Sequence, residues 1–66
     1  MRTIKNRLKE VREKKGVSQT ALSEMAGVSR MTIIKIESDR ETNITTDTMA
    51  SISKALETPI TEIFLF

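Results

Sequence analysis

Apolar residues recur along the chain at helical spacing, in short runs that small or polar residues separate. In the first run Ile4, Leu8 and Val11 stand at positions i, i+4 and i+7, which share one face of a helix. Gly16 follows the run, and glycine is the usual residue just after a helix C-terminus. The pattern therefore predicts a first helix over residues 4–15.

A second helix is predicted over residues 18–26 and a third over residues 29–38. Ser18 and Ser29 stand where these helices begin, and serine is a preferred N-cap residue. Gly27 lies between the two helices and adopts positive φ at low cost, so the chain can reverse sharply there. The apolar residues of the second helix form one stripe, made of Leu22, Met25 and Ala26.

The run "IIKI" in the third segment has the composition of a strand, because isoleucine is enriched in strands. Its surroundings favour a helix instead, since a glycine turn precedes it, a serine cap starts it and its charges have helical spacing. On a helix Ile33 and Ile36 point toward the core. Three residues then point nearly opposite: Met31, Lys35 and Ser38.

The remainder of the chain predicts a polar loop and two more helices. Residues 39–45 lack apolar periodicity and form the loop, and residues 46–56 carry apolar positions at helical spacing. In the last segment, "TPITEIF", Thr58 is a capping type and Pro59 fits the first position of a short fifth helix. The predicted fold is all-α, with five short helices in a single domain spanning residues 1–66.

Composition excludes several classes of function. The 66 residues include no cysteine and no histidine, which removes disulfides, thiolate metal sites, the commonest zinc ligand and the usual general base. Acidic residues are scattered, so no catalytic arrangement can be assembled from them. We therefore expect a protein that is not an enzyme and uses no metal or cofactor. No apolar run approaches the ~20 residues of a membrane span, so a cytoplasmic location is expected.

The net charge of +2 is unevenly distributed. Residues 1–15 carry seven basic and two acidic side chains, residues 16–40 are neutral overall, and residues 41–66 carry one basic and four acidic side chains. A basic front end suits a polyanionic partner that meets one face of the molecule. A solvated surface of mixed charge explains the same distribution, so the charge pattern alone does not choose between them.

Residues 18–38 have the sequence form of a helix-turn-helix, in which the turn "AGVS" joins two short capped helices. Apolar residues on both sides of the turn can meet at one junction: Leu22, Val28, Ile33 and Ile36. The segment "SQTALSEMAGVSRMTIIKIES" resembles the helix-turn-helix of the phage-repressor-like family, of the Cro/repressor or xenobiotic-response-element type. The flanks "NRLKEVREKKGVSQ" and "DTMASISKALETPITEIF" resemble the first, fourth and fifth helices of that family, so the resemblance covers residues 4–64.

The resemblance implies that the third helix lies in the major groove of DNA. The base-reading positions of the family correspond to Arg30, Met31 and Lys35. Arginine and lysine can donate to a guanine edge, whereas methionine offers apolar contact, for example to a thymine methyl group. The alternative is a solvated helix face on which Arg30 and Lys35 contact only phosphates and Met31 is passive. Ile34 departs from the family pattern, which has a small or polar residue there.

The resemblance also implies phosphate contacts that set the register of the third helix. Gln19 matches a phosphate-gripping glutamine of the family, at a helix N-terminus that attracts anions. The other candidates are polar residues at helix ends or in the following loop: Ser18, Ser29, Ser38, Arg40 and Asn43. N-capping alone would explain Ser18 and Ser29.

In the same family an arginine of the first helix pairs with a glutamate near the end of the third, and Arg12 and Glu37 match those positions. The resemblance implies an ion pair that is largely shielded from solvent and holds the fold together rather than contacting DNA. Removing one partner of such a pair leaves an unpaired buried charge, which costs about 3–5 kcal/mol.

The chain ends in an apolar run that predicts self-association. Exposed apolar segments on small domains are typical of interfaces, and we expect a homodimer through the last four residues, Ile63, Phe64, Leu65 and Phe66. Residues 1–4 and 64–66 can pair as a small terminal β-sheet, as in some short members of the family. The alternatives are a frayed end or a chain that continues into a second domain.

Together these features predict a prokaryotic-type, sequence-specific regulator of transcription that binds double-stranded DNA. The expected mode is repression, with a homodimer occupying a palindromic operator at the nucleoid. The alternative is an antitoxin-like or co-regulator module that grips another protein and binds DNA secondarily.

Overall fold

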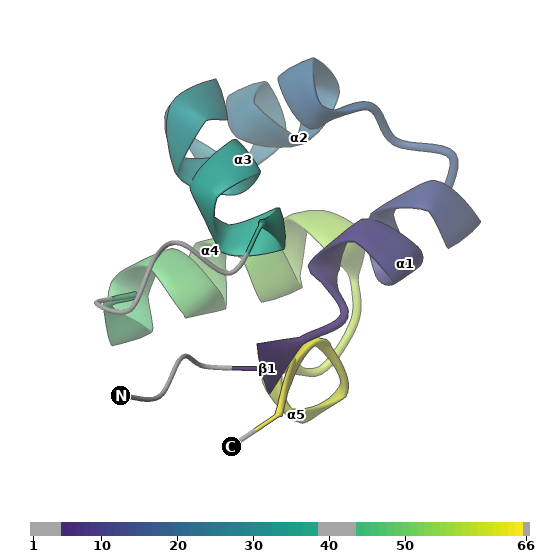
Figure 1. The fold of residues 1–66 in the computed structure, drawn as a ribbon, viewed down its shortest axis with the longest axis vertical. Helices are drawn as coiled ribbons and strands as arrows, with labels where there is room; N and C mark the ends of the chain where they lie inside the picture. The colour runs from purple at the N-terminus through teal and green to yellow at the C-terminus, as the bar shows by residue number, and fades with distance from the viewer. Residues whose placement is uncertain (1–4, 39–43, 66) are drawn as a thin grey trace.

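The structure of the chain, a computed structural model, describes residues 5–38 and 44–65. In chain order its elements are β1 (Lys5–Asn6), α1 (Leu8–Lys14), α2 (Gln19–Ala26), α3 (Arg30–Glu37), α4 (Thr46–Leu56), α5 (Ile60–Ile63) and β2 (Phe64–Leu65). The predicted five-helix architecture is confirmed. In Figure 1, α2 and α3 lie together at one end of the molecule, α4 packs against α2, and α5 lies with β1 at the other end.

One apolar core joins all five helices. Its side chains are each at most 2% exposed: Leu8, Leu22, Ile33, Ile36, Ile52, Leu56, Ile63 and Phe64. Burying a side chain of this size contributes about 1.5–3 kcal/mol. Helices of 4 to 11 residues are too short to be stable alone. The core therefore holds the helices, and with them the outward face of α3.

Capping side chains fix where α2, α3 and α4 begin. The hydroxyl oxygens of Ser18, Ser29 and Thr45 each accept the backbone N–H three residues further on, which satisfies a donor that the helix itself leaves unpaired. Gly27 ends α2 with a φ of 71°, a region that glycine adopts without steric penalty. The predicted serine caps and the predicted glycine turn are confirmed.

The first helix is shorter than the apolar pattern predicted. We predicted residues 4–15, but α1 begins at Leu8 and Asn6 belongs to β1. The Asn6 side chain stabilises this arrangement, because Oδ1 accepts the Leu8 N–H at 3.0 Å and Nδ2 donates to the Ile36 carbonyl at 3.0 Å. Tertiary contacts thus override local helical spacing ahead of Leu8.

The two strands form an antiparallel sheet in which Lys5 pairs with Leu65 and Asn6 with Phe64. The predicted terminal pairing is therefore present, but its N-terminal strand is β1. The predicted partner, residues 1–4, lies outside the described residues.

The start of the fifth helix differs slightly from the prediction. Pro59 is the N-cap of α5 rather than its first helical residue. The Thr58 hydroxyl does not cap the helix but donates to the Leu56 carbonyl at 2.9 Å. Across residues 5–38 and 44–65, no helix combines the length and apolar character that crossing a bilayer requires.

Candidate nucleic-acid interface

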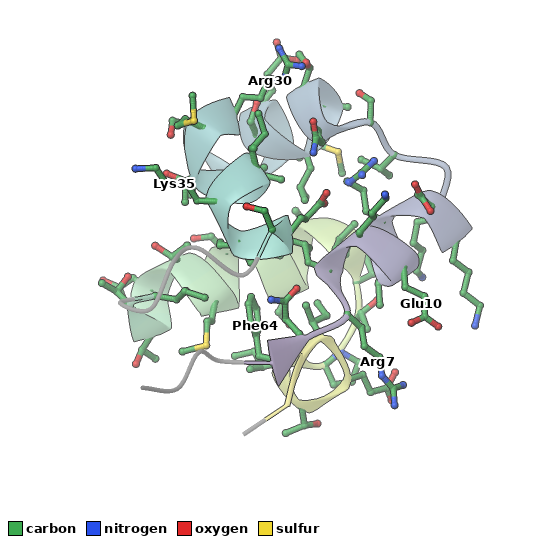
Figure 2. The ribbon with its side chains drawn as sticks, in the orientation of Figure 1. Arg7, Glu10, Arg30, Lys35 and Phe64 are labelled. Carbon is green, nitrogen blue, oxygen red and sulfur yellow. The ribbon has the colours of Figure 1, made fainter. Side chains whose placement is uncertain are left out.

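The outer face of α3 carries the three residues predicted to read bases. Arg30, Met31 and Lys35 are all exposed, with Met31 57% exposed, whereas Ile33 and Ile36 of the same helix are buried. In Figure 2, Arg30 and Lys35 lie at the α3 end of the molecule, far from Phe64. Burial of the two isoleucines therefore fixes which side of α3 faces outward.

The residue types on this face suit the edges of base pairs. The Arg30 guanidinium presents a planar fork of donors that matches guanine O6 and N7, and the Lys35 ammonium supplies donors to the same atoms. The exposed Met31 thioether adds apolar surface to the same helix. Ile34 lies at the flank of this face and is half-buried, so its departure from the family pattern does not expose a full isoleucine side chain.

The two capping serines keep donor capacity toward a phosphate. The Ser18 hydroxyl oxygen accepts the Ala21 N–H at 3.0 Å, and that of Ser29 accepts the Thr32 N–H at 3.1 Å. A hydroxyl that accepts a hydrogen bond still has its own proton to donate. In Ser29 that proton has a competing partner, because its hydroxyl lies 2.8 Å from the hydroxyl of Thr32.

Ser38 is differently engaged. Its hydroxyl donates to the Ile34 carbonyl at 2.8 Å, which occupies the only proton that the group has. A phosphate contact from Ser38 therefore requires the side chain to rotate away from the helix. The two remaining phosphate candidates, Arg40 and Asn43, lie outside the described residues.

The side chain of Gln19, at the start of α2, is hydrogen-bonded within the protein. Its Nε2 donates to Glu37 Oε1 at 3.0 Å. Glu37 also accepts from Arg12, whose Nε lies 2.7 Å from Oε2 and whose Nη2 lies 3.1 Å from Oε1. The expected ion pair between Arg12 and Glu37 is thus present, and it includes the predicted phosphate-binding glutamine as a third member.

This network is largely shielded from solvent. The Arg12 side chain is 10% exposed and that of Glu37 is 6% exposed. The third guanidinium nitrogen of Arg12, Nη1, donates to the Val17 carbonyl at 2.9 Å. The hydrogen bond to Glu37 and its negative charge raise the pKa of Arg12, outweighing the lowering that burial causes. The guanidinium therefore stays protonated, and α1, α2 and α3 are joined at one point.

A hollow of about 340 Å³ opens beside α1. Its lining combines three carboxylates with two cations and one amide: Glu10, Glu13, Glu37, Arg7, Lys9 and Asn6. Figure 2 shows Arg7 and Glu10 on the opposite side of the molecule from Lys35. Because acidic groups predominate there, the hollow is a poorer match for DNA phosphates than the outer face of α3.

The predicted dimer residues need correction. Ile63 and Phe64 are 0% and 1% exposed and belong to the core of a single chain. Ile63 is the last residue of α5, and Phe64 pairs with Asn6 in the sheet. They are therefore not available as an interface. The backbone of Leu65 forms part of β2, and Phe66 lies outside the described residues.

Two side-chain contacts near the candidate interface were not predicted from the sequence. Asn6 was not singled out, although an asparagine just ahead of an amphipathic run is a capping signal. The contact between Gln19 and Glu37 had no local signal, because 18 residues separate them and only the packing of α2 against α3 brings them together.

Two short helices joined by a glycine turn, the second with a cationic outer face, define a helix-turn-helix domain. A helix-turn-helix family model matches residues 8–63. The chain belongs to the Cro/C1-type helix-turn-helix family of DNA-binding regulators. The resemblance inferred from the sequence is confirmed.

Solved structures agree with this assignment. The restriction-modification controller protein C.AhdI from Aeromonas hydrophila is 27% identical, with a TM-score of 0.78 over 83% of this chain and 82% of that one. SinR, described as the master regulator for biofilm formation and solved in complex with DNA, is 30% identical, with a TM-score of 0.77 over 80% of this chain and 84% of that one. A search of curated protein sequences found no significant match.

Proposed function

We propose that the protein is a sequence-specific transcriptional regulator, a repressor that binds a palindromic operator as a homodimer and inserts α3 into the major groove. The observation that carries the proposal is the exposed face of α3, where Arg30, Met31 and Lys35 stand opposite the buried Ile33 and Ile36. The rigid core behind α3 supports a fixed presentation of these side chains.

The dimensions of α3 suit this role. An α-helix with its side chains is about 10–12 Å in diameter, and the major groove of B-DNA is about 12 Å wide and admits a helix such as α3. Arg30 stands at the N-terminal end of α3, where recognition helices contact base edges. Phosphates on either side of the groove would be held by polar groups at the ends of α2 and α3 and in the loop that follows: Ser18, Gln19, Ser29, Ser38, Arg40 and Asn43.

The comparisons support the partner and the type of action. SinR, which the chain resembles, is a regulator solved with DNA, and C.AhdI is a controller protein. Two-fold symmetry of a dimer would place two copies of α3 on successive turns of the duplex, which is why a palindrome is the expected site.

A second candidate is a protein-interaction module with secondary DNA binding. A structure of the complex of SinR with SinI contains a chain that is 30% identical to this one, with a TM-score of 0.77 over 82% of this chain and 52% of that one. In addition, Met25 is 55% exposed, although its spacing with Leu22 predicted an inward position. An exposed methionine on α2 is suited to an adaptable apolar contact.

Selection from a library of random duplexes tests the proposal. A DNA reader enriches a palindromic sequence, and its affinity for the selected duplex falls steeply with salt, by a slope of about −0.9 for each phosphate that a cation neutralises. Weak binding without enrichment contradicts operator recognition and leaves the protein-interaction role as the better description.

A matched control uses two arginines of the same chemistry. Arg30 and Arg7 are both exposed, but Figure 2 places them at different ends of the molecule. The change Arg7→Ala is expected to leave the selected sequence unchanged. If Arg7→Ala alters the sequence preference and Arg30→Ala does not, the interface has been assigned to the wrong face.

A further inference from the structure

The geometry points to Glu37 as a positioning residue for DNA: its carboxylate aims the amide of Gln19 at a backbone phosphate and ties that contact to the recognition helix. This inference rests on the proposed DNA-binding function and adds a residue that does not itself touch DNA. It is carried by the hydrogen bond between Gln19 Nε2 and Glu37 Oε1, 3.0 Å long.

The chemistry of the contact fixes the orientation of the Gln19 amide. A carboxylate is only an acceptor, so the NH₂ group of Gln19, and not its carbonyl oxygen, must face Glu37. The NH₂ group has two protons, and one of them is donated in the hydrogen bond to Glu37. The second proton remains available for a hydrogen bond to an anion. The acceptor oxygen of the amide points away from Glu37. An unrestrained glutamine would present either end.

Arg12 makes this arrangement compatible with a nearby phosphate. Both carboxylate oxygens of Glu37 accept from the Arg12 guanidinium, at 2.7 and 3.1 Å, so the negative charge of Glu37 is compensated within the network. The Arg12 guanidinium also donates to the Val17 carbonyl, just before α2. Arg12 therefore holds Glu37 still, and Glu37 in turn holds Gln19.

The position of Glu37 gives the contact a further consequence. Glu37 is the last residue of α3, and Gln19 is the first residue of α2. The hydrogen bond therefore links a phosphate contact at the start of α2 directly to the helix that carries Arg30 and Lys35. Phosphate contacts set the register of the base-reading helix, and here one side chain connects the two.

A double-mutant cycle on the selected duplex tests the inference. Glu37→Gln retains the shape but takes away one acceptor oxygen, and Gln19→Met removes both amide donors. If Glu37 acts through Gln19, Glu37→Gln weakens affinity roughly three- to tenfold alone and has no effect in the Gln19→Met background. An equal loss in both backgrounds overturns the inference, because Glu37 would then act only through the fold.

One additional readout and one control variant separate positioning from general damage. The loss should be the same on every duplex, because a phosphate contact carries no sequence information. Glu62→Gln is the matched control, because it makes the same charge change on an exposed residue of α5, which lies at the opposite end of the molecule from α2 and α3 (Figure 1), and it is expected to leave affinity unchanged. A loss of affinity that is confined to some duplexes contradicts the inference.

Nuclear magnetic resonance of the wild-type protein tests the same point if Glu37→Gln does not fold. Without DNA, one side-chain amide proton of Gln19 should resonate away from the values of exposed glutamines and exchange slowly. On addition of the selected duplex, the second proton should shift. Two averaged, rapidly exchanging protons in both states overturn the inference while operator binding stands. A wild-type protein that selects no duplex overturns both the inference and the proposed function.

Discussion

Glu37 accepts hydrogen bonds from two other helices, from Arg12 of α1 and Gln19 of α2. At the residue scale, Glu37 therefore contributes both to the stability of the fold and to the proposed DNA interface. Arg12 and Glu37 are nearly buried, so neither can lose its partner without leaving an unpaired charge in a place with little water.

We predict that Arg12→Ala leaves the protein largely unfolded at 25 °C. Loss of one partner of a buried pair costs about 3–5 kcal/mol, and a domain of this size has only ~3–5 kcal/mol of stability from its core. Circular dichroism with a urea titration measures the effect. Lys14→Ala, which removes an exposed cation from the same helix, is the control and should be nearly neutral. A urea midpoint for Arg12→Ala equal to that of the wild type contradicts the prediction.

Much at the residue scale was predictable, and the exceptions share a cause. The serine caps, the inward Ile33 and Ile36, and the Arg12–Glu37 pair followed from local spacing or from the family resemblance. The contact of Gln19 with Glu37 depends on two helices packing together. The pattern of a single sequence contains no information about the distance between residues on different helices. The roles of the predicted DNA-contacting residues stay predictions.

At the element scale, helix boundaries follow the caps where a cap exists. The bounds of α2, α3 and α4 match the predicted segments within one residue, because a capping serine or threonine marks each start. The start of α1 was misplaced because β1 pairs with β2 at the other end of the chain. A short strand that forms by pairing with a remote segment has no periodicity of its own to reveal it.

The residue that ends α4, Glu57, offers a test of whether backbone strain lowers the stability of the fold. Glu57 caps α4 in the left-handed region, with φ of 51° and ψ of 42°, where a residue with a Cβ is disfavoured by roughly 1 kcal/mol. We predict that Glu57→Gly raises the free energy of unfolding by up to about 1 kcal/mol, measured by urea denaturation, without changing DNA affinity.

The comparison for this prediction lies in the helix that Glu57 ends. Lys54 is exposed within α4, and Lys54→Gly should lower the free energy of unfolding by about 1 kcal/mol, the usual cost of glycine in a helix interior. If both glycine substitutions destabilise the protein equally, the left-handed conformation of Glu57 is not a source of strain.

At the scale of the whole molecule, the charge blocks of the sequence did not locate the interface. The basic block of residues 1–15 includes Arg7, which Figure 2 shows far from Arg30 and Lys35. Arg7 therefore does not lie on the face that carries Arg30 and Lys35, and the candidate interface follows from burial within α3 instead. Sequence periodicity identified that helix, whereas net charge did not.

We predict that the protein sediments as a dimer and that removing residues 65–66 shifts it toward monomer. Of the four residues predicted to form the dimer interface, Ile63 and Phe64 belong to the core. The expected dimer interface is therefore limited to residues 65–66. Sedimentation equilibrium at several concentrations measures the change. Met25→Ser is the control, since it removes an exposed apolar group on α2 and should leave the dimer intact. A monomer at every concentration would contradict association through the chain end.

The most direct test of the central claim is the sequence preference of Arg30→Ala, measured on a duplex library beside the wild type and Arg7→Ala. If α3 reads bases, Arg30→Ala loses discrimination at one position of each half-site, at a cost of about 1–3 kcal/mol there, while the other positions and the preference of Arg7→Ala stay as in the wild type. A uniform loss of affinity in Arg30→Ala, with the sequence preference unchanged, would contradict base reading by α3.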